Sequence, residues 1–262
     1  MDRQLRFNSE RSLLAIKVNQ IQTSKKQDGV VCPRYSWNPH NINKCSGFTL
    51  MQVAIALMVL GLLWTVGLKA MEVIDSRRVQ KLAADFRKVQ QSISEYQGKY
   101  RALPGDDPTI GSAISHLNGA NPCTATIVEG CKPGNGIIDG KWNDNTESSE
   151  SFLFWQHVRL AGFSSGVTDI TMTGYPETNA VGGRIGIANQ GATPIAALRG
   201  AFIVCSDGIP GDYVQPIDMA VDDGKTDSGF MMVTLAGTAK GGAAIAVNAI
   251  SEHDSYLICM GV

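Results

Sequence analysis

The sequence has few charged residues: they make up 18% of 262 positions, against 44% hydrophobic residues. That balance excludes a disordered polar protein, because such chains have too little apolar surface to bury. Residues 48–68, 21 positions in all, contain no charged residue and no proline. At about 1.5 Å per residue, a helix of this length matches the roughly 30 Å of a bilayer core. The segment is therefore predicted to cross a membrane.

A second absence separates this segment from an ordinary secretory signal peptide. The residues ahead of it are basic, as in a signal peptide, but the apolar run is too long and lacks a small-x-small cleavage site at its end. Residues 1–47 hold eight Lys or Arg against three acidic residues, a net charge of +5, so the remainder carries −6. Basic flanks stay in the cytoplasm, and the acidic remainder is predicted to face outward. An acidic external part argues against nucleic-acid binding.

The apolar pattern continues beyond the charge-free segment. Hydrophobic residues follow at alternating steps of four and three, which places them on one helical face: Leu82, Phe86, Val89, Ile93, Tyr96 and Tyr100. We expect one helix of about 50 residues over 48–103, with its first half in lipid. It should stop near Gly98, ahead of Leu103-Pro104-Gly105, because proline removes a backbone donor.

Gly47-Phe48-Thr49-Leu50, directly ahead of this helix, resembles the processing site of type IV prepilins and of the pseudopilins of type II secretion. The resemblance implies that a prepilin peptidase cuts after Gly47, removes residues 1–47 as a cytoplasmic leader and methylates Phe48. It also implies a single-pass inner-membrane protein with its globular part in the periplasm. Such a subunit assembles with other pilin or pseudopilin subunits on an inner-membrane platform.

One position departs from the family pattern. The family usually has glutamate four residues after the mature N-terminus, and this chain has Gln52 there. In the family that carboxylate is thought to pair with the N-terminal amine of a neighbouring subunit, where an uncompensated charge in lipid is costly. Glutamine can accept a hydrogen bond but carries no charge, so a minor, initiating or tip subunit is expected.

The six cysteines divide between the two sides of the membrane. Cys32 and Cys45 lie in the leader, and four lie in the external part. Four is an even number in an oxidising compartment, and of three possible pairings we favour Cys123 with Cys131 and Cys205 with Cys259. A zinc site is the alternative, but the sequence has no C-x-x-C and no histidine at ligand spacing beside these cysteines.

The external part, residues 104–262, is expected to be an α+β domain. Residues 104–150 are rich in glycine and proline, with a short helix expected at Ile110–Leu117, and a second helix is expected at Ser151–Gly162. Short apolar or alternating runs then predict strands at 184–188, 201–206, 229–235 and 256–260. A small antiparallel sheet packed on the amphipathic half of the long helix would bury the stripe, and that arrangement resembles the pilin fold.

Several chemical motifs are weak. Gly162-Phe163-Ser164-Ser165-Gly166 matches G-x-S-x-G, but a helix is predicted where a nucleophile elbow needs a strand. Residues 139–150 have the length of an EF-hand loop without its ligand pattern. Asp218, Asp222, Asp223 and Asp227 form an acidic loop in which calcium is an alternative to a hydrated turn. His157, two positions from Trp155, is expected to be a half-exposed structural residue.

Two classes of function follow. The first is a structural, minor subunit of a type IV pilus or type II secretion pseudopilus, without enzymatic activity or a required cofactor. The alternative is a membrane-anchored periplasmic enzyme or binding module that does not polymerise. Cleavage between Gly47 and Phe48 discriminates between them.

Overall fold

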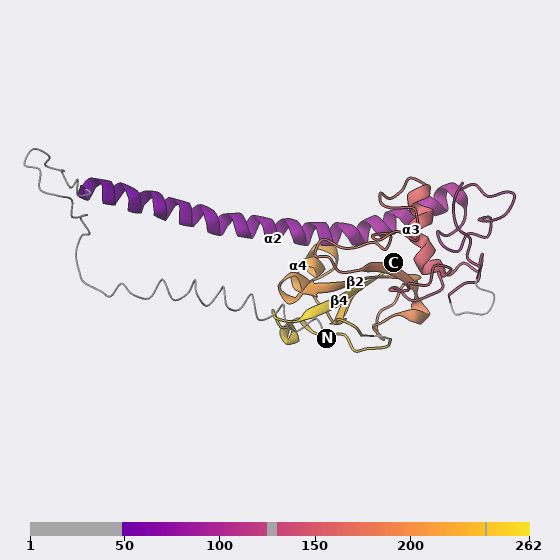
Figure 1. Cartoon of the computed structure of the whole chain (residues 1–262). Helices are drawn as coiled ribbons and strands as arrows, with labels where there is room; N and C mark the ends of the chain where they lie inside the picture. The colour runs from indigo at the N-terminus through magenta and orange to yellow at the C-terminus, as the bar shows by residue number, and fades with distance from the viewer. Residues whose placement is uncertain (1–48, 125–129, 239) are drawn as a thin grey trace, which may run out of the picture. The chain divides into compact units, whose positions relative to one another are not determined.

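The computed structural model describes residues 49–124, 130–238 and 240–262, and within helix α2 it leaves the side chains of 65–72 undescribed. The predicted leader, residues 1–47, and Phe48 lie outside this description. The chain divides into two compact units, Met1–Ala56 and Leu57–Val262. The described part is an α+β structure with a small antiparallel sheet (Figure 1).

Helix α2 spans Leu50–Tyr100. Its last third carries the amphipathic stripe, in which Leu82, Phe86, Val89, Ile93 and Tyr96 are at most 3% exposed. The helix ends at Tyr100, close to the predicted stop at Gly98, and Arg101 follows in the left-handed region with φ 57°. Three residues later Pro104 cannot continue a helix.

The first third of α2 has a different environment. Its eleven Leu, Met, Val, Ile and Trp side chains from Leu50 to Trp64 are all exposed, from 46% at Val53 to 90% at Leu50. Among the described residues, no helix combines the length and the apolar character needed to cross a membrane. The span expected at 48–68 is thus not found there, and both Phe48 and the side chains of 65–72 fall outside the described part.

The sheet has four antiparallel strands in the order β1-β2-β4-β3. They are β1 (Ile185–Asn189), β2 (Phe202–Pro210), β3 (Met231–Leu235) and β4 (Ser255–Gly261). The predicted strands and their antiparallel pairing are therefore confirmed. Each was recognisable as a short apolar run bounded by turn residues.

Two further helices accompany the sheet (Figure 1). Helix α3 (Glu150–Leu160) matches the predicted second helix, and Ser149 caps it by accepting a hydrogen bond from the Phe152 amide at 3.4 Å. Helix α4 (Gly211–Val221) was not predicted, because Pro216 lies inside it. Short 3₁₀ turns occupy Gln190–Ala192 and Val247–Ala249.

The prediction of a helix at Ile110–Leu117 is wrong, because the structure has successive turns there. Serine and threonine side chains bond the local backbone in place of a helical ladder. The Ser112 hydroxyl donates to the Thr109 carbonyl at 2.6 Å, and Ser115 donates to the Leu117 carbonyl at 3.3 Å.

Both faces of the sheet are buried. On one face, alternate strand residues such as Val204, Ile258 and Val233 pack with the α2 stripe, α3 and α4 in the main core. On the other face, Ile203, Leu257 and the Cys205–Cys259 pair form a second cluster that includes Trp142, Ile195 and Leu198. Loops rather than helices cover this second face. Successive strand residues alternate between the two clusters, so consecutive positions in β1, β3 and β4 are buried.

Both predicted disulfides are present. Cys123 is bonded to Cys131, and Cys205 is bonded to Cys259. The second pair joins residues that face each other directly on the central strands β2 and β4. The sequence separation is 8 residues for the first pair and 54 for the second.

We expect the two disulfides to differ in their contribution to stability. In the loop-entropy model, the Cys205–Cys259 bond should add about 4 kcal/mol and the Cys123–Cys131 bond about 2.5 kcal/mol. Paired Cys→Ser variants, unfolded with urea, measure both values. Thiol labelling of the denatured, non-reduced domain should detect none of these four cysteines. Four labelled thiols, or equal losses for the two pairs, would contradict this expectation.

Candidate functional site

The segment between α2 and α3, residues 101–149, contains no helix or strand within its described part. Three buried acidic residues organise it instead, namely Asp106, Asp107 and Glu150, each at most 4% exposed. Buried carboxylates need several donors. Backbone amides of the segment supply most of them, so its folding and its buried charges depend on each other.

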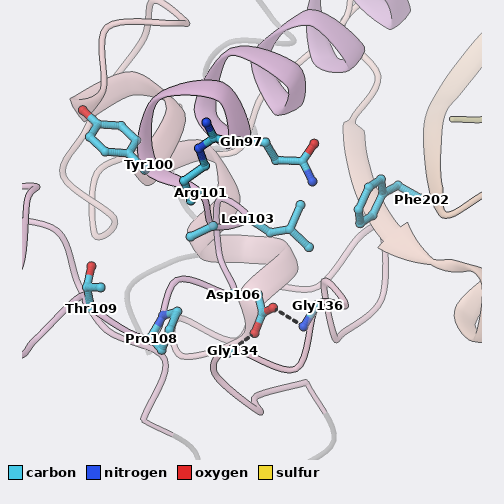
Figure 2. Close-up of a pocket in the computed structure, with 11 residues that line it drawn as sticks. Gln97, Tyr100, Arg101, Leu103, Asp106, Pro108, Thr109, Gly134, Gly136 and Phe202 are labelled. Carbon is cyan, nitrogen blue, oxygen red and sulfur yellow. Dashed lines mark hydrogen bonds between the residues drawn. The ribbon is translucent and has the colours of Figure 1, made fainter.

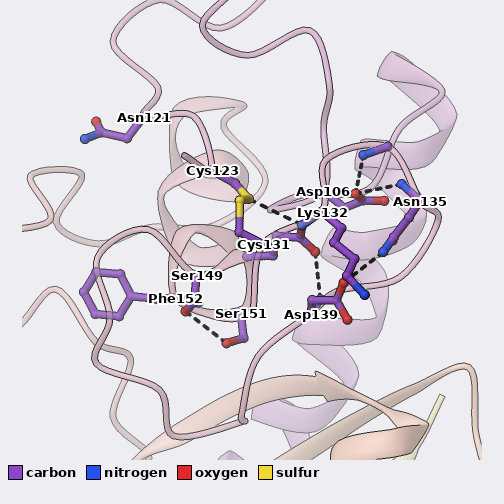
Figure 3. The surroundings of a disulfide bond; sticks show 12 residues. Asp106, Asn121, Cys123, Cys131, Lys132, Asn135, Asp139, Ser149, Ser151 and Phe152 are labelled. Carbon is purple, nitrogen blue, oxygen red and sulfur yellow. Dashed lines mark hydrogen bonds between the residues drawn. A yellow bond between two sulfur atoms is a disulfide. The ribbon is translucent and has the colours of Figure 1, made fainter. Parts of the chain in front are cut away.

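Glu150 is the first residue of α3 and accepts hydrogen bonds from the loop around the Cys123–Cys131 disulfide. Figure 3 shows the surroundings of this disulfide. One carboxylate oxygen accepts the Lys132 amide and lies 3.5 Å from the Cys123 sulfur, while the other accepts the Asp139 amide at 2.7 Å. Burial raises the pKa of Glu150 to about 7, although the two amides act in the opposite direction, and the nearby Asp106 and Asp139 raise it further.

Asp106 holds the adjoining turn. Its carboxylate accepts the amides of Gly134, Asn135 at 3.1 Å and Gly136 at 2.7 Å. Both glycines have positive φ, 80° and 78°, a conformation that brings successive amides to one acceptor and that glycine adopts without strain. Burial raises the pKa of Asp106 in spite of these hydrogen bonds.

Asp107 connects α2 to the same segment. Its carboxylate accepts the Tyr96 hydroxyl at 2.8 Å and the Thr109 amide and hydroxyl at 2.9 and 2.7 Å. The Nε2 atom of His116 is 2.8 Å away, and the His116 ring stacks on Tyr100 at 4.1 Å between centroids. Burial acts to raise the pKa of Asp107, but the Thr109 and Tyr96 hydrogen bonds and His116 outweigh it, so the pKa is lowered.

His157 is a structural residue, but it is fully buried rather than half-exposed as expected. Its Nδ1 atom accepts the Gly105 amide at 2.9 Å, so Nε2 carries the proton and donates to the Asn121 carbonyl at 3.0 Å. Burial lowers its pKa. The expectation failed because α3 is buried on nearly all sides, which a one-sided apolar pattern does not indicate.

The zinc alternative is not supported by the cysteines. In the described part of the chain, one group of three possible metal ligands lies within 4.8 Å, formed by Cys123, Cys131 and Glu150. Both sulfurs are bonded to each other and provide no thiolate. Asp139 of the EF-hand-length segment is engaged by Asn135 at 2.8 Å and Asn189 at 3.1 Å.

The acidic residues considered for calcium do not converge on one point. Asp222 accepts the Phe230 and Met231 amides at 2.7 and 3.0 Å, and Asp223 pairs with Lys225 at 3.6 Å. Asp218 lies in α4 rather than in a loop, a correction that follows from the helix continuing past Pro216. It is fully buried, one oxygen accepts the Gly224 amide at 2.7 Å, and burial raises its pKa to about 6. These contacts describe a helix end and turn.

The G-x-S-x-G serine lacks the context of a nucleophile elbow. Ser164 follows helix α3, not a strand, and its hydroxyl donates to the Ser165 carbonyl at 3.3 Å. The motif is therefore a chance match in the turn after α3.

Gln52 takes part in a reciprocal cap at the start of α2. Its side-chain oxygen accepts the Thr49 amide at 3.0 Å, and its own amide donates to the Thr49 hydroxyl oxygen at 3.3 Å. This is the capping-box arrangement, in which an N-cap threonine and a residue three positions later satisfy each other's free amides. Gly47 and Phe48, the predicted cleavage and methylation residues, lie outside the described residues.

An open pocket of about 550 Å³ adjoins the Asp106 turn at the end of α2. Its walls come from the last turn of α2, the two loops that Asp106 joins and the first residue of β2 (Figure 2). The sequence did not single out this pocket. In the sequence, Asp106 stands out only by its place between Pro104 and Pro108, and the turn whose amides it accepts lies 28 or more residues further along the chain.

Comparison of the chain with protein-family models, with curated proteins and with solved structures found no match.

The buried carboxylate of Glu150 predicts a specific pH dependence. Its pKa is raised on folding, so the folded state binds its proton more tightly than the unfolded chain, and stability falls as pH rises from about 4.5 to about 7. We expect the free energy of unfolding to drop by about 1–3 kcal/mol over this range because of Glu150. Asp218 adds a fall in the same direction through pH 6.

The comparison of wild type with Glu150→Gln isolates this contribution. Urea unfolding at pH 5 and pH 8 should show a smaller difference for Glu150→Gln, even though that variant is less stable at pH 5. Glu147→Gln, an exposed residue of the same segment, should keep the wild-type difference. An unchanged difference in Glu150→Gln would show that its carboxylate is not the cause.

Proposed function

We propose that this protein is a structural, minor subunit of a type IV pilus or type II secretion pseudopilus. It is processed between Gly47 and Phe48 by a prepilin peptidase and then assembles through the N-terminal part of α2. Its partners are other pilin or pseudopilin subunits and an inner-membrane assembly platform. Its globular domain would lie in the periplasm before assembly.

The observation that carries this proposal is the division of α2 into two environments. Residues 82–96 bury their apolar side chains in the domain core, while the eleven large apolar side chains from Leu50 to Trp64 stay exposed. Burying a side chain of this size is worth about 1.5–3 kcal/mol. Exposed apolar side chains in such number indicate a surface that meets lipid or other subunits.

The charge pattern adds a second line of support. The segment 48–68 has no charge and follows a basic leader, so it is suited to a bilayer before assembly and to a helix bundle afterwards. The membrane part of the proposal rests on this sequence pattern, because no span was found among the described residues.

The cap at Thr49 supports the cleavage position. Within the described residues, α2 begins at Leu50 and is capped by Thr49, so the proposed cleavage bond precedes α2 in the sequence. After cleavage, the Thr49 amide remains a peptide amide and Gln52 can still accept it.

The proposed role has no catalytic part. The carboxylates of Asp106 and Glu150 accept backbone amides, and His157 bonds the Gly105 amide and the Asn121 carbonyl, so these three residues have structural contacts. The alternative, a membrane-anchored periplasmic enzyme or binding module, is favoured by one feature, the open pocket at the end of α2. Processing and filament incorporation distinguish the two.

The first test is processing. Co-expression with a prepilin peptidase should shorten the chain by its first 47 residues. Gly47→Ala should reduce this cleavage at least about tenfold, because a site built around glycine leaves no room for a methyl group. Gly98→Ala is the matched control, since a methyl group there meets no atom within 4 Å. Retention of the leader by wild type in the presence of active peptidase would refute the proposal.

The second test concerns Gln52. In a repeating filament each subunit would bring its charged amine near a neutral amide, at a cost of about 3 kcal/mol in the membrane-like interior. We therefore expect low copy number, at the distal end. Gln52→Glu keeps the capping box and supplies the missing charge, so it should increase incorporation into sheared filaments measured by quantitative immunoblotting.

Gln80→Glu, an exposed substitution on the same helix, is the control and should not increase incorporation. Long filaments built from the wild-type chain alone would overturn the assignment to the tip.

A further inference from the structure

The pocket at the end of α2 is lined by residues from four separate segments. They are Gln97 and Tyr100 of α2, the loop 101–109, the turn 134–136 and Phe202 of β2. Figure 2 draws Gln97 above Leu103, with Phe202 to the right of both and Asp106 below them. Leu103, Pro108 and Phe202 give apolar walls, and Gln97 and Arg101 give polar groups. Pockets that combine apolar walls with a few polar groups are typical of small-ligand sites.

Arg101 is unusual in its backbone. Among the described residues it is the one non-glycine residue with positive φ, at 57°. Its amide donates to the Gln97 carbonyl at 3.0 Å, so it occupies the position after the helix where glycine is usually found. Any side chain in this conformation costs free energy that glycine avoids. Glycine at position 101 would therefore make the fold more stable than the arginine that the chain has there.

Within the described part of the molecule, no contact of the Arg101 side chain offsets the free-energy cost of its left-handed backbone. It is exposed and has no hydrogen bond, ion pair or ring contact with another described residue. The Gln97 side chain is likewise exposed and without a partner among the described residues. Strained residues of this kind cluster at ligand sites, where the side chain is needed for contacts with another molecule.

The charges in the pocket select the ligand. Asp106 lines it too, but its oxygens already accept three loop amides, two of which are drawn in Figure 2. Thr109 donates its hydroxyl to Asp107 at 2.7 Å. Arg101 is thus the charged group with free capacity, and a planar guanidinium pairs best with a carboxylate.

We propose that this pocket binds a carboxylate attached to an apolar group, such as an N-acylated amino acid or the C-terminal residue of a peptide. The carboxylate pairs with Arg101 and accepts from the Gln97 amide, and the apolar group packs against Leu103, Pro108 and Phe202. This activity is independent of filament assembly. It would hold whether or not the chain is processed at Gly47.

The direct test is calorimetric titration of the full chain in a non-ionic detergent. N-acetyl-L-leucine should bind, and its amide, which has the same shape without the charge, should bind at least about tenfold more weakly. The tripeptide Gly-Gly-Leu tests the source of the ligand. Tighter binding of the tripeptide assigns the pocket to a chain end, and weaker binding assigns it to a small acid.

Two Arg101 variants separate binding from folding. Arg101→Gln should weaken N-acetyl-L-leucine binding at least about tenfold, while Arg77→Gln, on an exposed position of α2 outside the pocket, should not. Arg101→Gly should lose binding and yet raise Tm by about 2–4 °C, because it relieves the left-handed strain. Equal affinities for acid and amide, unchanged binding by Arg101→Gln, or no binding of N-acetyl-L-leucine up to about 10 mM would each overturn the proposal.

Discussion

The packing of the α2 stripe against the antiparallel sheet is the interaction on which the rest of the domain depends. Four side chains of the stripe pack with alternate residues of β2, β4 and β3 in one core, namely Leu82, Phe86, Val89 and Ile93. Tyr96 is buried in a separate cluster with Ile110 and Leu117. Each buried side chain of this size contributes about 1.5–3 kcal/mol. α2 is a single helix, so the burial of its stripe also determines the point along the helix at which it leaves the core. It thereby separates the part that stabilises the domain from the part that stays exposed.

A second constraint acts in the segment between α2 and α3. The described part of this segment contains no helix or strand, so its amides must be satisfied in other ways. Asp106 and Glu150 accept five amides between them, and Asp107 joins the segment to Tyr96 of α2. The Cys123–Cys131 bond lies against Glu150 in the same region. The result is a loop held by buried carboxylates, and it is this loop that forms the wall of the pocket beside Arg101.

Much of the fold could be predicted from the sequence because its signals are local. The strands were short runs between turn residues, the α2 stripe had a clear helical period, and four cysteines in the external part suggested two bonds. Helix α4 could not be predicted, since Pro216 argues against a helix and only burial of Val214 and Ile217 outweighs it. The turns at 110–117 were mistaken for a helix because serine and threonine compete for the backbone there.

The candidate sites were less predictable. Asp106 and Glu150 are 44 positions apart, and their shared loop appears only after the chain has folded. Gln52 was identified by its departure from a family pattern, but its bond to Thr49 depends on where the helix begins. Arg101 gave no signal, because a left-handed conformation is a property of the backbone and cannot be read from the residue type. Local patterns thus indicate elements, and long-range contacts decide the sites.

The central claim is that the exposed apolar third of α2 is covered by other subunits in the working protein. Photo-cross-linking in the native host, with a benzoylphenylalanine at Leu57 or Leu60 and a control at exposed Lys81, tests it most directly. The account predicts that the first two positions form adducts with other pilin or pseudopilin subunits, and that these adducts disappear in the Gly47→Ala variant. Adducts with lipid alone, in wild type as in the variant, would contradict it.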